Sequence, residues 1–189
     1  MCCLFGILDY KNHFNAKQKN KIISVLSAVC EARGTDATGI AYNYNNYLCI
    51  YKRPVAAHKM KFNIPDANVI MGHTRMTTQG NERFNFNNHP FYGKADNTEF
   101  ALAHNGVLYN DTALRKAENL PETKIETDSY IAVQLIEKKK SLGFESLKFM
   151  AEKLAGSFTI TVMDKVNNLY FVKGDNPMCI YHYPDIGVY

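Results

Sequence analysis

The order of strand-like and helix-like apolar patterns along the chain constrains its fold most. Short apolar runs typical of strands lie near both ends, and stretches with helical spacing lie mainly between them. We expect helices at 17–32, 111–119, 128–140 and 144–154, and strands at 3–9, 39–44, 47–52, 68–72, 100–103, 107–109, 157–163, 168–173 and 178–183. This order predicts an α+β fold with largely antiparallel sheets rather than a wound parallel sheet.

The first expected helix is amphipathic, because lysine and asparagine fill the face opposite its apolar residues. The apolar positions that recur at helical spacing are Ile22, Val25, Leu26 and Val29. Gly34 follows shortly after and is expected to cap the C-terminal end of the helix.

Two segments rich in polar residues indicate connections. Asn45-Asn46 separates two expected strands, and asparagine tolerates the left-handed backbone of a tight turn. Residues 76–98 are rich in Asn, Thr, Gln and Gly and are expected to form one long loop. Loops of this length inside a compact domain are usually functional or disordered.

Size and composition indicate one compact domain spanning residues 1–189. The 46% of hydrophobic residues can form a core without help from disulfides. The formal net charge of +4 is mild, and the run Lys138–Lys140 lies at the end of an expected helix, where cations complement the helix dipole. These features argue against a nucleic-acid-binding surface.

The sequence also argues against a membrane or secreted protein. No stretch approaches the roughly 18 apolar residues that a membrane span requires. Lys11, Asn12 and His13 interrupt the apolar start too early for a signal peptide. We therefore expect a cytoplasmic location.

Cysteine is the first candidate for chemistry, and the chain has five, an odd number. No C-x-x-C spacing occurs, which excludes a zinc ribbon and a thioredoxin-type motif. In a reducing compartment all five are expected to be free thiols. They are Cys2, Cys3, Cys30, Cys49 and Cys179.

Cys2 can acquire its own base if Met1 is removed. Its side chain is small enough for methionine aminopeptidase to process the chain. The thiol would then share a residue with a free α-amine of pKa about 7.7–8.0. Such an amine can take the thiol proton directly or through a water, so nucleophile and base come from one residue. Taken alone this signal is weak, because buried cysteines are usually inert packing residues.

Arg75 lies where an expected strand enters the polar segment 76–98. An arginine at such a place can form a bidentate pair with a carboxylate ligand, or a surface ion pair. The residues Thr77, Thr78, Gln79 and Gly80 follow, and they could orient a ligand or build turns.

Asn105 and Gly106 follow an expected strand that carries His104. An amide NH₂ beside a glycine N–H gives two converging donors, which an oxyanion hole needs. Asn-Gly is also the commonest turn dipeptide. Spacing alone supports both interpretations equally.

Asp128 precedes an expected helix, so it could be an N-terminal capping acid or a carboxylate that binds an ammonium group. His89-Pro90 is interpreted as a buried loop anchor rather than a catalytic imidazole, because no second catalytic partner lies nearby in the sequence. His13, His58 and His182 show no partner pattern and are read as ordinary residues.

Taken together, the motifs resemble the glutaminase domain of class II glutamine amidotransferases, in the N-terminal nucleophile hydrolase superfamily. The resembling segments span nearly the whole chain in the expected order. They are Met-Cys-Cys-Leu-Phe-Gly (1–6), Arg-Gly-Thr-Asp-Ala-Thr-Gly-Ile-Ala (33–41), Gly-His-Thr-Arg-Met-Thr-Thr-Gln-Gly (72–80), Asn-His-Pro-Phe (88–91), Ala-His-Asn-Gly-Val-Leu-Tyr-Asn (103–110), Glu-Thr-Asp-Ser (126–129) and Leu-Ala-Gly-Ser-Phe (154–158).

The resemblance implies a four-layer αββα sandwich, with two mainly antiparallel sheets between layers of helices. It also implies glutamine hydrolysis through a γ-glutamyl thioester on Cys2, with release of ammonia and then glutamate. Asn105 and Gly106 match the oxyanion hole. Arg75 matches the residue that binds the substrate α-carboxylate, and Asp128 the one that binds its α-ammonium group. Thr78 matches a further ligand-contacting position. No cofactor or metal is implied.

Three features depart from the family. Cys3 stands where glycine is usual, so a second thiol beside the nucleophile could alter the backbone or act as a redox partner. Met76 replaces a common aromatic residue. The chain ends at Tyr189 with no synthase domain, which suggests a stand-alone glutaminase that passes ammonia to a partner synthase. The alternatives are an amidase for another substrate and a non-catalytic binding module of the same fold.

Overall fold

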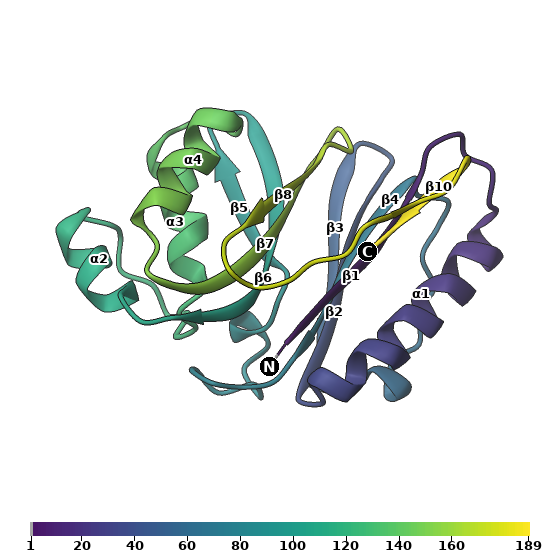
Figure 1. Ribbon diagram of the computed structural model, residues 1–189, viewed down its shortest axis with the longest axis horizontal. Helices are drawn as coiled ribbons and strands as arrows, with labels where there is room; N and C mark the ends of the chain where they lie inside the picture. The colour runs from purple at the N-terminus through teal and green to yellow at the C-terminus, as the bar shows by residue number, and fades with distance from the viewer. Residues whose placement is uncertain (1) are drawn as a thin grey trace.

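The computed structural model describes residues 2–189, which form two antiparallel sheets between layers of helices (Figure 1). A six-stranded sheet has the order β3-β2-β4-β1-β10-β9, and a four-stranded sheet has the order β5-β6-β7-β8. Helix α1 covers the outer face of the first sheet, and α3 and α4 cover the outer face of the second (Figure 1). The predicted four-layer α+β sandwich is confirmed.

The bounds of the elements agree with most of the predicted ones. The helices are α1 (Ala16–Cys30), α2 (Asp111–Ala117), α3 (Tyr130–Lys138) and α4 (Phe144–Lys153). The strands are β1 (Cys3–Asp9), β2 (Ala37–Tyr44), β3 (Tyr47–Arg53), β4 (Val69–Arg75), β5 (Phe91–Ala95), β6 (Thr98–Leu108), β7 (Gly156–Asp164), β8 (Leu169–Lys173), β9 (Tyr181–His182) and β10 (Ile186–Val188). Short 3₁₀ turns occur at Glu31–Arg33, Ala57–Lys59 and Asn85–Asn87.

Three apolar clusters hold the four layers together. One lies between the four-stranded sheet and α3 and α4, and includes Phe100 and Ile131. A second lies between the six-stranded sheet and α1, and includes Phe5 and Ile23. The third joins the two sheets and includes Met71. Because successive side chains of a strand point to opposite faces, β1, β2, β4, β6 and β7 each contribute to two of these clusters.

The turn at Asn45-Asn46 is confirmed, since both residues have positive φ, 49° and 65°, between β2 and β3. The prediction of one loop at 76–98 is wrong for its second half. That half contains β5, which pairs with β6 from Phe91↔Leu102 to Ala95↔Thr98. Strand β5 is short and carries a glycine, so its local signal is weak, and its partner supplies the stability that the segment lacks by itself.

The predicted face of α1 needs correction. The fully buried positions are Lys19, Ile23 and Ser27, whereas Val25 and Val29 are 56% and 71% exposed. The buried stripe is therefore rotated relative to the apolar stripe in the sequence. A buried lysine ion pair, rather than hydrophobicity alone, sets this orientation.

The predicted cap at Gly34 is also wrong for α1. Helix α1 ends at Cys30, and Gly34 follows the 3₁₀ turn with an extended backbone, φ −170°. Its lack of a side chain serves a close approach, because a Cβ there would lie 2.5 Å from the carbonyl carbon of Arg75. This glycine lets the segment after α1 pack directly against the end of β4.

Lys19 joins α1 to the end of β1 through a buried ion pair. Its Nζ lies 3.1 Å from Asp9 Oδ2 and 2.5 Å from Asp66 Oδ1, and both the Lys19 and Asp9 side chains are fully buried. Asp9 also accepts hydrogen bonds from the amides of His13 and Phe14. Burial raises the pKa of Asp9, but these N–H groups and Lys19 outweigh burial and lower it overall.

We expect Lys19→Met to lower the free energy of unfolding by about 3–5 kcal/mol, because it leaves Asp9 buried without its cation. Urea denaturation at pH 7 measures this change. Lys17→Met, at an exposed site on the same helix, is the control and should change little. Since the pKa of Asp9 is lowered by folding, its contribution is present above its unfolded pKa of about 4 and is lost as pH falls through the folded value. The difference between Lys19→Met and the wild-type protein should therefore shrink in acid; a difference that stays constant into strong acid would contradict this account.

Candidate active site

Strand alternation separates the two adjacent cysteines at the start of β1. Leu4 packs in the cluster between the sheets, and Phe5 packs against α1. Followed back toward the N-terminus, this alternation directs Cys3 to the same side as Phe5, toward α1. It directs Cys2 to the same side as Leu4, toward the second sheet. The neighbouring thiols therefore occupy different environments.

The same alternation brings residues of both sheets to the space beside Cys2. On β4, Met71 faces the second sheet, and Arg75 lies two full alternations further along on the same face. On β6, Ala101 and Ala103 face the first sheet, and Asn105 follows on that face. Two distant strands thus place Arg75 and Asn105 between the sheets, near the start of β1.

Cys2 is buried and held by backbone groups. Its Sγ lies 3.4 Å from the amide nitrogen of Met76 and 3.5 Å from the carbonyl oxygen of the same residue. Arg33 Nε donates to the Cys2 carbonyl oxygen at 3.2 Å. Burial raises the pKa of the Cys2 thiol, although the Met76 N–H and the charge of Arg75 oppose this. The thiol is therefore protonated at neutral pH and needs a base to react.

Arg75 is a buried cation bound only by neutral groups. It is 2% exposed, and it donates to Asn88 Oδ1 at 2.6 Å, to the carbonyls of Gln79 and Gly80 at 2.6 and 3.1 Å, and to Thr127 Oγ1 at 3.5 Å. No carboxylate within residues 2–189 lies within ion-pair distance of it. The predicted alternative of a surface ion pair is wrong. Since buried charges are normally paired, Arg75 is suited to bind an anionic ligand.

Asp128 is the matching buried anion. It is 2% exposed and forms no ion pair with a lysine, arginine or histidine of residues 2–189. Its Oδ2 accepts the Leu108 amide at 2.7 Å, and its Oδ1 accepts the Ser129 hydroxyl at 3.2 Å. Ser129 Oγ lies 2.7 Å from His104 Nδ1, which fixes the hydroxyl in turn.

The alternative of Asp128 as a helix cap is wrong. The N-cap residue of α3 is Ser129, and no side chain caps that helix. Asp128 instead turns toward β6. Burial raises the pKa of Cys2 and lowers that of Arg75, and the charge of Asp128 adds to the first effect and opposes the second, so the carboxylate lies within electrostatic reach of both.

Asn105-Gly106 is not a turn, so that alternative is wrong as well. Both residues lie inside β6, which pairs with β7 in unbroken register from Phe100↔Asp164 to Leu108↔Gly156. The Asn105 side chain is 9% exposed, and its amide makes no hydrogen bond within residues 2–189; its Oδ1 is buried and unpartnered. A buried amide without a protein partner is available to a ligand.

Gly106 presents its backbone N–H to the open edge of β6. Strand β5 ends opposite Leu102, so the following residues of β6 have a neighbour on one side only. Leu108 donates its N–H away from β7, to Asp128, and backbone groups of residues two apart in a strand point the same way. Gly106 has φ +147°, and a Cβ there would lie 1.9 Å from the Ser157 carbonyl oxygen, so this position requires glycine.

Two further residues considered from the sequence are Thr78 and His89. Thr78 is exposed, on the bend that also carries the carbonyls bound by Arg75. His89 is fully buried, with its ring 4.2 Å from that of His73 and 4.3 Å from that of Phe91, measured between centroids. This packing agrees with the anchor interpretation of His89.

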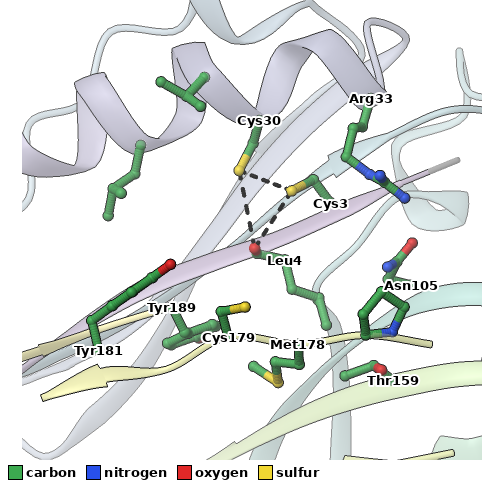
Figure 2. A pocket seen from close by; sticks show the side chains of 13 residues that line it. Cys3, Leu4, Cys30, Arg33, Asn105, Thr159, Met178, Cys179, Tyr181 and Tyr189 are labelled. Atoms are coloured by element: carbon green, nitrogen blue, oxygen red, sulfur yellow. Dashed lines mark hydrogen bonds between the residues drawn. The ribbon is translucent and has the colours of Figure 1, made fainter. Parts of the chain in front are cut away.

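A cavity of about 450 Å³ opens next to the start of β1, and Cys3 and Leu4 line it but Cys2 does not. It is lined by Asn105 and Thr159 from the second sheet, by Cys3 and Cys30, and by the C-terminal segment that carries Met178 (Figure 2).

No group of three or more His, Cys, Asp or Glu residues within the described chain is placed to hold a metal ion. Nor does any helix in residues 2–189 have the length and apolar character to cross a membrane.

Comparison with known proteins identifies the family. Residues 73–186, more than half of the chain, match the model of the glutamine amidotransferase domain. The chain belongs to this family. Among curated glutamine–fructose-6-phosphate aminotransferases, the amidotransferase domain described here is 32% identical over 160 residues to that of Bacillus thuringiensis and 30% identical over 190 residues to that of Sulfurisphaera tokodaii. These matches cover 79% and 95% of this chain but only 26% and 31% of the relatives.

Solved structures agree on the fold. The amidotransferase domain superposes on a glutamine phosphoribosylpyrophosphate amidotransferase from Bacillus subtilis with a TM-score of 0.73 and 22% identity, over 100% of this chain and 41% of the other. A second structure, described as the allosteric regulatory enzyme of purine biosynthesis, gives a TM-score of 0.75 with 20% identity, again over 100% and 41%.

Several residues of the site were not assigned a role from the sequence. Arg33, Asn88 and Ser129 each lie inside a quoted motif, yet only the structure shows that they bind Cys2, Arg75 and Asp128. Asn176, whose Nδ2 donates to the Asn105 carbonyl at 2.8 Å, lies in a segment with no motif. Such supporting contacts join parts of the chain far apart in sequence and leave no local signal.

Proposed function

We propose that this amidotransferase domain hydrolyses the side-chain amide of glutamine to glutamate and ammonia, with Cys2 as the nucleophile. The observation that carries the proposal is the pair Arg75 and Asp128, a buried cation and a buried anion without ion-pair partners in residues 2–189, both within electrostatic reach of a buried thiol. A free amino acid presents one carboxylate and one ammonium group at its α-carbon. Arg75 then binds the carboxylate and Asp128 the ammonium group.

The thiol is activated by the α-amine of its own residue. This step requires removal of Met1, which lies outside the described residues and stays a prediction. Burial raises the pKa of the Cys2 thiol, so the thiol needs a base, and the amine takes its proton as the sulfur attacks the δ-carbon of glutamine. The protonated amine then returns the proton to the departing nitrogen, ammonia leaves, and a γ-glutamyl thioester remains.

Asn105 and Gly106 stabilise the negative oxygen that forms during this attack. The two donors are the side-chain NH₂ of Asn105, which makes no hydrogen bond to residues 2–189, and the outward N–H of Gly106, the next residue on the same strand. The same donors act again when water attacks the thioester and releases glutamate. We assign Thr78 to the rim of the substrate site, next to the carbonyls that hold Arg75.

We also propose that the ammonia passes to a synthase partner. The relatives are named aminotransferases and amidotransferases, and each is much longer than this chain. The cavity lined by Asn105 would offer ammonia a space next to the proposed oxyanion hole.

Incubation of the purified chain with glutamine tests the hydrolysis. We expect equal amounts of glutamate and ammonia, with asparagine and α-N-blocked glutamine turned over far more slowly, because neither reaches both charges and the thiol together. Failure to release ammonia from glutamine, or faster cleavage of the blocked amide, would contradict the proposal.

Ser129→Ala tests the support of Asp128. The change removes one of the two hydrogen bonds to the carboxylate, and hydrogen bonds to charged groups contribute about 1.5–3 kcal/mol, so we expect KM for glutamine to rise roughly 10- to 100-fold with kcat nearly kept. Steady-state kinetics measure both constants. Ser141→Ala, at an exposed site, is the control. An unchanged KM would show that Ser129 does not position the anion.

A further inference from the structure

Two cysteines outside the proposed catalytic machinery lie in contact. Cys3 Sγ and Cys30 Sγ are 2.9 Å apart and share an S–H···S hydrogen bond (Figure 2). Cys3 is the first residue of β1, and Cys30 is the last residue of α1. Strand alternation turns Cys3 away from Cys2 and toward the helix, so the hydrolysis uses neither thiol of this pair.

The pair is accessible from solvent. Both side chains are partly exposed, and both line the cavity of about 450 Å³ beside the site. The cavity admits a molecule much larger than water. A small oxidant can therefore reach the two sulfurs in the folded protein.

The two thiols differ in reactivity. The hydrogen bond from Cys30 and the positive charge of Arg33 lower the pKa of Cys3 to about 7, while the same contact and burial raise the pKa of Cys30. The contact therefore favours a thiolate at Cys3 beside a protonated thiol at Cys30. This is the arrangement of an attacking and a resolving cysteine.

We propose that Cys3 and Cys30 form a reversible disulfide when the protein meets a hydroperoxide. The Cys3 thiolate attacks the terminal peroxide oxygen, the O–O bond breaks, and Cys3 becomes a sulfenic acid while the other oxygen takes a proton from solvent and leaves as water or alcohol. The Cys30 sulfur then attacks Cys3 Sγ, the S–O bond breaks, and the departing hydroxide takes the Cys30 proton and leaves as water. Two thiols lose two electrons and the hydroperoxide gains them.

The geometry favours closure. A disulfide has an S–S distance of about 2.05 Å, so the sulfurs need to approach by only about 0.9 Å from 2.9 Å. The bond would join the start of β1 to the end of α1. It would also remove the Cys3 thiol from the neighbourhood of Cys2, since Cys30 captures the sulfenic acid on the side of the strand that faces the helix.

Intact mass and peptide mapping of the full chain test this proposal independently of any glutaminase activity. After treatment with an equimolar amount of hydrogen peroxide and then an alkylating agent, we expect a loss of two hydrogen atoms, two fewer alkylated thiols and a Cys3–Cys30 linked peptide. Dithiothreitol should restore both thiols. Cys3→Ser and Cys30→Ser should each lose the link, whereas Cys49→Ser and Cys179→Ser should keep it.

Cys179 is the sharper control, because it lines the same cavity. A Cys2–Cys3 or Cys30–Cys179 link, or both thiols of the pair still fully alkylated, would overturn the proposal, as would direct progress of Cys3 to sulfinic acid. Mapping of the wild-type chain decides these outcomes even if a serine variant folds poorly.

Discussion

Replacing Cys2 with alanine should remove glutamine hydrolysis. The variant has no sulfur to form the thioester, and loss of the nucleophile in a comparable acyl-transfer enzyme lowers kcat by about 10⁶, so we expect a fall of at least about 10⁴. The substrate site remains, because Arg75 and Asp128 are held by other residues. Ammonia release from glutamine, measured at saturating substrate, reports the loss, and glutamine should still bind in calorimetry.

Cys3→Ala is the matched control for this change. Cys3 is adjacent in sequence, but its side chain contacts Cys30 rather than the space between the sheets. We expect this variant to keep most of the activity. Hydrolysis that persists in Cys2→Ala but disappears in Cys3→Ala would mean that the two thiols have been assigned the wrong way round.

Asn105→Ala should lower kcat for glutamine by about 10²–10³, the usual loss when one donor of an oxyanion hole is removed. The effect should fall on kcat rather than KM, because the Asn105 side chain donates its hydrogen bond to the substrate oxygen only when that oxygen becomes negative. The Asn105 side-chain amide makes no hydrogen bond within residues 2–189, so its removal breaks none in the folded protein. A fall in kcat therefore reports on catalysis rather than on a lost structural contact. Single-turnover thioester formation isolates the affected step.

Asn97→Ala provides the control, since Asn97 is exposed in the turn that precedes the same strand. It should leave kcat unchanged. A rise in KM with kcat preserved in Asn105→Ala would instead indicate that Asn105 contacts the ground-state substrate. It would then have no part in stabilising the oxyanion.

The sequence predicted the fold well where local pattern and final structure agree. β1 and the Asn45-Asn46 turn are set by neighbouring residues, and both were predicted correctly. Asn105-Gly106 is different, because the dipeptide favours a turn while nine consecutive pairs with β7 hold it in a strand. Long-range pairing decided a choice that local propensity left even.

Elements that depend on distant partners were missed. The segment 76–98 has the composition of a loop, and β5 within it is stable because β6 and α3 cover it. Likewise, the polar face of α1 gave no sign that Lys19 is buried, because its partners Asp9 and Asp66 come from two other segments. A one-dimensional pattern cannot show which charge will find a partner.

The candidate active site also combines features that the local sequence indicates with features that depend on distant partners. The candidates Cys2, Arg75 and Asp128 came from motif order, and the structure brings them within electrostatic reach of one another. The roles of these three residues stay predictions. That Arg75 and Asp128 are buried without ion-pair partners is visible only in the three-dimensional structure. The sequence offered an N-cap and a surface ion pair as explanations for these charges, and the structure removes both.

An intact-mass measurement after reaction with an electrophilic glutamine analogue tests the central claim most directly. We predict one adduct, on a chain that begins at Cys2, mapped to the Cys2 sulfur and prevented by excess glutamine. A chain that keeps Met1 and takes up no analogue, or an adduct on Cys3 instead, would contradict the assignment of Cys2 as an N-terminal nucleophile.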